Sequence, residues 1–444
     1  MSVLELPAEI LGKIFDHYVH DRWKVRQVDS DRPLSKLRCI SAYSDSRTHP
    51  VDLTHVCQLW RTTAISMPQL WATIYASQMK SEGDVKMFEL WLERSAGRDG
   101  TYPLILSVKQ SARAPVDLRE FFSLAISQHR RWKYIRLGID GGYLPFFELL
   151  HTVAPLSTLC GFQVDFFDLN QRNRESLQRL IGVLCSSTAL RSVEFGDESS
   201  GHNPIVVPWD SLSLTTLSFC GLELGHLIRI LSSSMDTLRD ISVTILQSPL
   251  SLKGLTPIPN VTMHRLQSLR IKSYGYGCHA SVAFDKLTLP TLHKLYLPWR
   301  FTPNKDSELQ TRGWESLLSL LERSNCKLQA FEFGDGDIPD LVKNLESPLF
   351  EHLTSLQVTS NFYVYPDITQ LLDALSEVCE ETQRPRMLPL LETLIFKALH
   401  SEDDVRVASV AAYGGCGKSK LRRVFTQNIE AGENALEMDL KDQE

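Results

Sequence analysis

The sequence lacks several features that define large classes of protein. Its nine cysteines include no Cys-x-x-Cys pair, which argues against a zinc ribbon or a dithiol redox motif. No apolar run approaches the roughly 20 residues that a membrane-spanning helix needs, and no basic and apolar leader opens the chain. The net charge of −6 is opposite to the basic excess of a general nucleic-acid binder. We therefore expect a protein of a reducing compartment, cytoplasmic or nuclear, with neither a membrane nor a nucleic acid as its partner.

Motifs for catalysis and for cofactor binding are absent or incomplete. Gly414–Ser419 ends in Gly-Lys-Ser, as a phosphate-binding loop does, but the first glycine of that motif would fall at Ala412. Gly334–Asp337 lacks the later acidic ligands of a calcium loop, and His17 and His20 have no third metal ligand near them in sequence. We expect no catalytic residue, no cofactor and no metal, although residues distant in sequence could still meet in the fold.

The first 20 residues carry the pattern of an amphipathic helix. Pro7 suits the first helical turn, because the N–H that it lacks would have no partner there. Glu9 places a negative charge in the same turn, where the helix dipole favours it. Leu6, Ile10 and Ile14 recur every four residues, and they form an apolar stripe that Leu11, Phe15 and Tyr18 widen.

A second apolar block follows between residues 53 and 71. Leu53, Val56, Cys57 and Trp60 have helical spacing, and Pro68 is expected to stop that helix before Leu70-Trp71. Two or three short helices with this much apolar surface cannot bury it among themselves. We therefore expect a partner to cover part of it.

These two blocks together resemble an F-box. The similar residues are Leu-Pro-x-Glu-Ile-Leu-x-x-Ile-Phe from Leu6, Val-Cys-x-x-Trp-Arg from Val56, and Leu70-Trp71. They cover about 40 positions and are split by a polar insertion at residues 20–50, as in F-box-like proteins of mushroom-forming fungi. The resemblance implies a helical module that binds the Skp-family linker protein of a cullin ubiquitin ligase. The linker-binding residues that it implies are Leu6, Pro7, Glu9, Ile10, Ile14, Phe15, Val56, Cys57, Trp60, Leu70 and Trp71.

Two of these residues have a second interpretation. Trp60 and Trp71 either close the core of the helical module or meet the linker, and core packing is favoured for Trp60. For Leu6, Pro7, Ile10 and Ile14 partner contact is favoured, because so small a module has no second layer to bury them.

A short apolar pattern recurs from Trp132 onward. Each copy has a large apolar residue, a second one three positions later and a third two positions after that, which is typical of a half-buried strand. The ten copies are Trp132/Ile135/Leu137, Leu159/Phe162/Val164, Leu190/Val193/Phe195, Leu214/Leu217/Phe219, Leu238/Ile241/Val243, Leu266/Leu269/Ile271, Leu292/Leu295/Leu297, Leu328/Phe331/Phe333, Leu353/Leu356/Val358 and Leu391/Leu394/Phe396. Several of their spacings match the 20–29 residues of a leucine-rich repeat.

Helical patterns lie between these copies, at residues 174–185, 314–321 and 368–378. Strand and helix units of this kind stack, and about ten of them would form a curved solenoid with strands on its concave side. The pattern resembles irregular leucine-rich repeats. The alternative is an ordinary α/β domain with unrelated hydrophobic strands, and the fold class is α/β in both cases.

The expected division of the chain follows from these patterns. Residues 1–75 form an F-box-like helical domain, residues 84–131 a bridging or capping region, residues 132–428 the solenoid, and residues 429–444 an acidic, frayed tail. Within the bridge we expect a helix around Met87–Trp91, a strand at 104–108 and a helix at 118–126. Polar segments at 198–203, 274–279 and 302–312 are expected to be loops between units.

The function that this reading favours is that of a substrate-recognition adaptor of an SCF-type cullin ubiquitin ligase. The N-terminal helices would bind the linker, and through it a cullin, while the repeats would bind an unknown target protein. Catalysis would then come from proximity, and this chain would not be an enzyme. One alternative is a protein-interaction scaffold outside any ligase, and another is an enzyme with a site assembled only in the fold.

Overall fold

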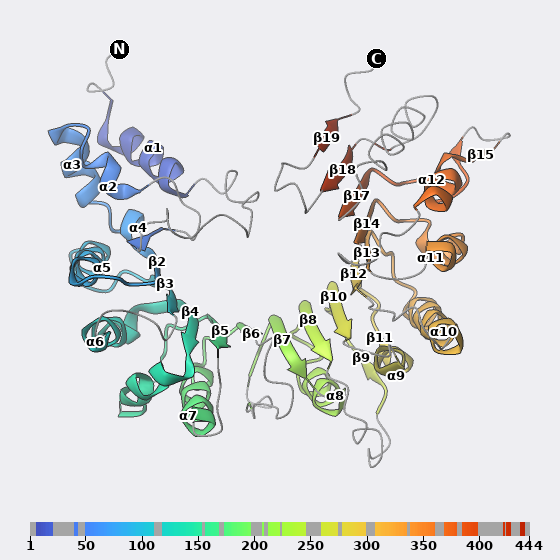
Figure 1. Cartoon of the computed structure of the whole chain (residues 1–444), viewed down its shortest axis with the longest axis horizontal. Coiled ribbons are helices and arrows are strands. Elements are labelled where there is room, and N and C mark those ends of the chain that lie inside the picture. The colour runs from blue at the N-terminus through green and yellow to red at the C-terminus, as the bar shows by residue number, and fades with distance from the viewer. Residues whose placement is uncertain are drawn as a thin grey trace. The chain divides into compact units, whose positions relative to one another are not determined.

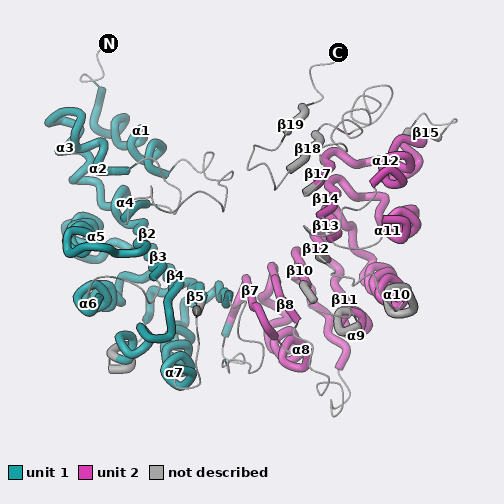
Figure 2. Tube along the Cα trace, viewed as in Figure 1, with its two compact units in different colours: residues 1–212 teal, residues 213–444 magenta. Residues whose placement is uncertain are grey.

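The structure is a computed structural model. It describes residues 6–20, 40–42, 49–110, 118–152, 156–167, 173–196, 207, 212–222, 224–245, 259–273, 278–298, 307–334, 338–359, 368–379, 384–397, 421, 423–427 and 436–439. The chain divides into two compact units, residues 1–212 and residues 213–444 (Figure 2). The boundary between them falls inside residues 132–428, which the sequence pattern predicts to form one solenoid. The expected division of the chain into helical domain, bridge, solenoid and tail stays a prediction.

Unit 1 begins with four short helices. They are α1 (Ala8–His20), α2 (Pro50–Leu53), α3 (Gln58–Ile65) and α4 (Pro68–Trp71). The first helix lies where the sequence predicts it. The prediction of one helix through Leu53 and Trp60 is wrong, because the chain leaves the helical conformation between α2 and α3.

The break between α2 and α3 has a local cause. The hydroxyl of Thr54 donates to the carbonyl of Val51 at 2.7 Å, and Arg61 Nε donates to the carbonyl of Thr54 at 2.9 Å. These bonds satisfy carbonyls at the end of α2, and Cys57 then adopts an extended conformation as the residue that starts α3. As expected, α3 ends before Pro68, which occupies the first turn of α4.

The rest of unit 1 consists of strands with helices on one side. Its strands are β1 (Ile40–Ser41), β2 (Thr73–Ser77), β3 (Leu104–Gln110), β4 (Trp132–Asp140), β5 (Gly161–Phe167) and β6 (Ser192–Gly196). Its helices are α5 (Glu82–Ser95), α6 (Arg119–Ser127) and α7 (Asn173–Cys185), with 3-10 turns η4 (His129–Arg131) and η5 (Gly141–Thr152). Strands β2 to β6 pair in parallel in chain order, and β1 pairs antiparallel with β2 (Figure 1).

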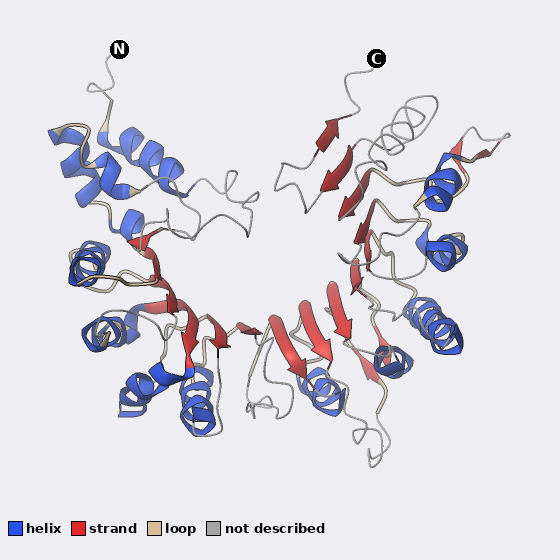
Figure 3. Ribbon diagram, viewed as in Figure 1, coloured by secondary structure: helices blue, strands red, loops and turns tan. Residues whose placement is uncertain are grey.

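Unit 2 has the same construction. Its main strands are β7 (Thr216–Leu222), β8 (Asp240–Ile245), β10 (Ser268–Ser273), β12 (Lys294–Pro298), β13 (Ala330–Gly334), β14 (Ser355–Thr359), β17 (Thr393–Lys397), β18 (Arg423–Gln427) and β19 (Leu436–Asp439). Its helices are α8 (Leu224–Ser233), α9 (Cys278–Lys286), α10 (Ser307–Ser324), α11 (Ile338–Leu345), α12 (Thr369–Ser376) and the 3-10 turn η7 (Pro348–Phe350). Two small pairs, β9 (Val261–Thr262) with β11 (Leu287–Thr288) and β15 (Val378–Cys379) with β16 (Arg384–Pro385), complete it. In each unit the strands form one layer and the helices the other (Figure 3).

The strand registers confirm the repeating pattern. In unit 2 the middle apolar residues of successive copies pair side by side, which gives the row Leu217, Ile241, Leu269, Leu295, Phe331, Leu356 and Leu394. In unit 1, Ile135, Phe162 and Val193 form the corresponding row. All of these side chains are at most 2% exposed, so each row is a continuous strip of the core.

Backbone hydrogen bonds outside the strands follow the same repeat. The residue after the first leucine of a copy uses its carbonyl to accept two consecutive N–H groups of the next copy. Arg239 accepts from Gln267 and Ser268, and Gln329 accepts from Thr354 and Ser355, at 2.8–3.0 Å. This recurrence shows that the copies are equivalent structural units. The chain is thus a mixed α/β protein of stacked strand and helix units.

Predictions for the segments between strands gave mixed results. The helices at 174–185 and 314–321 and the elements of the bridge are confirmed, whereas Val378, at the end of the predicted 368–378 helix, lies in β15. The predicted loop at 302–312 is wrong from residue 307, where α10 begins. Residues 307–312 contain neither proline nor glycine, and polar composition alone does not break a helix. Residues 278–279 likewise belong to α9, and residues 436–439 of the acidic tail form β19, whose sequence Leu-Glu-Met-Asp alternates apolar and acidic residues. Residues 198–203, 274–277, 335–337 and 414–419 lie outside the described part.

Candidate functional site

Helix α1 has an apolar arc that is only half covered by the protein. Leu11, Phe15 and Val19 pack into unit 1 and are at most 2% exposed. The adjoining stripe, Ile10 and Ile14, is 42% and 44% exposed. A helix that serves only the core of its own chain needs one apolar stripe. The second stripe leaves an apolar surface open on α1.

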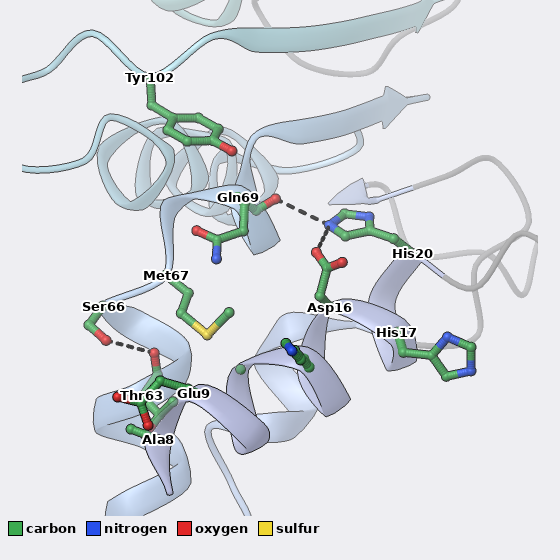
Figure 4. A pocket seen from close by; sticks show the side chains of 12 residues that line it. Ala8, Glu9, Asp16, His17, His20, Thr63, Ser66, Met67, Gln69 and Tyr102 are labelled. Carbon is green, nitrogen blue, oxygen red and sulfur yellow. Dashed lines mark hydrogen bonds and ion pairs between the residues drawn. The ribbon is translucent and has the colours of Figure 1, made fainter.

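The polar side of α1 faces a cavity of about 960 Å³ (Figure 4). Glu9, Lys13, Asp16, His17 and His20 line it from α1, and residues of the α3–α4 region with Tyr102 line the other side. The ring of His20 lies 3.2 Å from the carbonyl oxygen of Gln69 and 3.9 Å from the carboxylate of Asp16. The contact with Gln69 ties the end of α1 to α4, so the open apolar stripe lies on a helix that is anchored at its C-terminal end.

A cluster of aromatic rings attaches the N-terminal helices to the first strand and helix unit. The indole N–H of Trp71 donates to the carbonyl of Ala64 at 2.8 Å. Its ring meets the edge of Trp91 at 5.3 Å, and the guanidinium of Arg94 lies 4.4 Å from its centre. Phe15 packs on Trp60, with the ring centres 4.9 Å apart. The N-terminal helices therefore have a core of their own that continues into α5.

The residues expected to bind a linker protein fall into three groups. Phe15, Leu70 and Trp71 have no exposed surface, whereas Leu6, Cys57 and Trp60 are half-buried and Pro7, Glu9, Ile10, Ile14 and Val56 are exposed. A side chain with no exposed surface cannot touch a partner unless the helices rearrange. We therefore assign Phe15, Leu70 and Trp71 to the core and restrict the candidate surface to the exposed and half-buried groups.

Three further apolar side chains belong to the candidate surface. Tyr18 in α1 and Leu59 and Ile65 in α3 are 39–40% exposed, and α1 and α3 pack against one another. None of the three is among the contact residues predicted from the sequence. The spacing Ile10, Ile14 and Tyr18, each four residues after the last, was the signal that could have identified Tyr18.

The outward strand faces carry polar clusters. In unit 1, Arg136 of β4 forms an ion pair with Asp165 of β5 at 3.1 Å, and Gln163 donates to the same carboxylate. The hydroxyl of Tyr134 donates to Glu194 of β6 at 3.4 Å. Burial, and then the neighbouring Glu194 charge, raises the pKa of Tyr134, and burial also raises the pKa of Glu194 above its usual range.

Unit 2 carries a related cluster. The guanidinium of Arg270 on β10 lies 4.5 Å from the ring centre of Tyr296 on β12 and bonds to Glu332 on β13 at 3.0 Å. These three residues occupy one register row on three neighbouring strands. The arginine thus stacks on the tyrosine and reaches the carboxylate beyond it.

The described residues offer surfaces rather than a metal site. Within them no group of three or more histidine, cysteine, aspartate or glutamate side chains is placed to hold a metal ion. Their helices include none that is both long and apolar enough to span a bilayer. What this part of the chain presents is a set of surfaces: an apolar one on the N-terminal helices and a polar one on the strands.

Comparison with known proteins identifies a distant structural likeness. No protein-family model matches the chain, and no curated protein matches it. Among solved structures, the crystal structure of the Rad7 and Elc1 complex in yeast is similar over 88% of both chains, at 12% sequence identity and a TM-score of 0.35. A likeness at this level does not define a family. The chain is an α/β protein of stacked strand and helix units, and its F-box resemblance stays a prediction.

Proposed function

We propose that this chain is a substrate-recognition adaptor of an SCF-type cullin ubiquitin ligase. The N-terminal helices bind the Skp-family linker protein, and the strand and helix units bind a target protein. The observation that carries the proposal is the uncovered apolar stripe of α1, with Ile10 and Ile14 at its centre. An apolar surface on a helix held rigidly by its neighbours is what a helix-binding partner requires.

The attachment of the N-terminal helices is consistent with separate binding sites for the linker and the target. Aromatic packing around Trp71 and Trp91 fixes the N-terminal helices on the first strand and helix unit. A linker bound at α1 would therefore hold at least that strand and helix unit in place. The chain would then act by raising the concentration of the target near the ubiquitin carrier, with no bond chemistry of its own.

The binding surface can be tested with purified full-length chain and purified Skp-family linker. An Ile10→Asp, Ile14→Asp double variant replaces two exposed apolar side chains by carboxylates. Burying the exposed part of each isoleucine is worth about 1 kcal/mol, and desolvating two carboxylates adds to the loss, so we expect affinity to fall about 100-fold or more. Undiminished binding by the double variant would reject this surface.

A matched control makes the same chemical change elsewhere. Met87 in α5 and Met235 after α8 are 38% and 44% exposed, comparable to the two isoleucines. A Met87→Asp, Met235→Asp variant is expected to bind the linker as the unaltered chain does. An equal loss in both double variants would show that added negative charge, rather than the α1 stripe, weakens binding.

The second candidate function is a protein-interaction scaffold outside any ligase. The burial of Phe15, Leu70 and Trp71 favours the scaffold function, because these residues cap the first strand and helix unit. The two functions differ in one outcome. Recovery of a cullin together with the linker supports the ligase, whereas recovery of the linker without a cullin supports the scaffold.

A further inference from the structure

On the strand face of unit 1, no cation among the described residues forms an ion pair with Glu194 or stacks on Tyr134, although the charge of Arg136 lies near both. Tyr134 on β4 lies across β5 and donates its hydroxyl to Glu194 on β6. The ring occupies the space above Gly161, where a Cβ atom would lie only 2.8 Å from a ring carbon. Glycine at this position therefore leaves the space that the tyrosine ring occupies.

The nearest arginine is already engaged. Arg136 directs its guanidinium to Asp165, with two of its nitrogens at 3.1 and 3.3 Å from the same carboxylate oxygen. Among the described residues, Glu194 has the Tyr134 hydroxyl as its hydrogen-bond partner and no ion pair. Arg136 thus pairs with Asp165, and the glutamate is left with one weak hydrogen bond at 3.4 Å.

Unit 2 has a tyrosine and a glutamate with an arginine in place, although Tyr296 and Glu332 pair directly in the register, whereas Glu194 lies two strands from Tyr134 and two positions beyond its row. Arg270 stacks on Tyr296 and bonds to Glu332, whose side chain is 12% exposed. The residue that pairs with Tyr134 in the register, as Arg270 pairs with Tyr296, is Ile105. Unit 1 therefore has an exposed isoleucine where unit 2 has its own cation.

We propose that the ring of Tyr134 and the carboxylate of Glu194 bind a basic side chain, lysine or arginine, of the target protein. The incoming cation stands over the ring and pairs with the carboxylate, as Arg270 does within unit 2. The ring supplies a cation–π interaction, and the recessed carboxylate supplies a charge-assisted hydrogen bond. This inference rests on the proposed function of target recognition and names the chemistry of the target.

The test uses full-length chain and an array of immobilised 12-residue random peptides with a fixed central residue: arginine, lysine, glutamine or glutamate. The unaltered chain is expected to prefer central arginine or lysine. Glu194→Gln is expected to remove that preference and to weaken binding of the best basic peptide about 10- to 100-fold by fluorescence anisotropy. A preference for glutamate or glutamine, a basic preference that survives Glu194→Gln, or no peptide binding by the unaltered chain would overturn the proposal.

Two further variants distinguish an effect on the cation site from the effects of misfolding and of net charge. Gly161→Ala changes neither binding residue but forces the Tyr134 ring out of its position, so we expect weaker binding of the basic peptide. Glu148→Gln changes the same charge at an exposed position of η5, away from the strands, and is expected to bind normally. Weakening by Glu148→Gln as large as by Glu194→Gln would reduce the effect to net charge and reject the site.

Linker binding is measured on the same proteins. Glu194→Gln is expected to bind the Skp-family linker with unchanged affinity, because Glu194 is on β6 and the α1 stripe is intact. Loss of peptide binding with the linker retained supports this inference. If the unaltered chain does not bind the linker, the proposed ligase function is rejected. The peptide preference alone then shows whether Tyr134 and Glu194 bind a basic side chain.

Discussion

Replacement of Arg131 tests how the first strand and helix units of the chain are joined. Arg131 ends the turn η4 and is 6% exposed. Its guanidinium donates to the carbonyls of Tyr102 and Leu92 at 2.9 and 3.3 Å, and to Gln128 Oε1 and Ser95 Oγ, both at 2.8 Å. None of these partners is a carboxylate. Burial lowers the pKa of Arg131, as expected for a cation held only by neutral acceptors.

The effect of Arg131→Met follows from what these bonds satisfy. Leu92 and Ser95 belong to the last turn of α5, and the Leu92 carbonyl keeps a second donor there, the Ser95 hydroxyl at 2.8 Å, whereas the Tyr102 carbonyl and Gln128 Oε1 lose the donor that Arg131 supplies. Each buried acceptor left without a donor costs about 1–3 kcal/mol. Part of this cost is offset, because the variant no longer has to desolvate a buried cation. We expect Arg131→Met to lower the free energy of unfolding by about 2–4 kcal/mol. Arg131→Lys should be no better, because one ammonium cannot reach all four acceptors.

The assay must resolve parts of the chain, because stacked units can open locally. Hydrogen exchange followed by mass spectrometry should show faster exchange at residues 82–104 in Arg131→Met, together with a lower melting temperature. Arg179→Met is the control, since Arg179 is 52% exposed and its pair with Glu148 is worth under about 1 kcal/mol. Unchanged exchange at residues 82–104, or equal destabilisation by the control, would refute the role assigned to Arg131.

Three further predictions concern Trp71, Glu194 and Leu295. Trp71→Phe removes the donor to Ala64 and should lower stability by about 1–3 kcal/mol in thermal melts while linker affinity stays the same, whereas a selective loss of linker binding would return Trp71 to the interface. The raised pKa of Glu194, which faces Tyr134, Arg136 and Asp165, means that its contribution to stability is greatest below the ordinary pKa and is lost as pH rises through the raised value. Glu194→Gln should therefore gain in melting temperature relative to the unaltered chain as pH rises from 4 to 8, and a constant difference over that range would contradict the burial of a charged Glu194. Leu295→Ala, at a side chain with no exposed surface, should cost about 2–5 kcal/mol and speed hydrogen exchange most in β10, β12 and β13, while an even effect over unit 2 would show that the units do not unfold separately.

Local pattern was sufficient to predict most of the fold. Leu269, Leu295 and Phe331 could be placed in equivalent positions from sequence because a half-buried strand shows its period of two in the order of its residues. The first helix was predicted for a similar reason, since its apolar residues recur with the helical period. The break at Thr54–Cys57 was missed because helical spacing continues through it, and the bonds of Thr54 and Arg61 that stop the helix depend on side-chain geometry.

By itself, the sequence determined that α1 is apolar over a wide arc and that strand and helix units follow it. It also indicated a partner for the N-terminal helices, because the apolar surface exceeds what short helices can cover. Only the tertiary structure decided which part of that surface is used within the chain. Phe15, Leu70 and Trp71 turned inward and Ile10 and Ile14 outward, since burial depends on which neighbours surround a side chain in space. The meeting of Tyr134 with Glu194 across Gly161 was decided in the same way, because strand register brings together residues that are 60 positions apart in the chain.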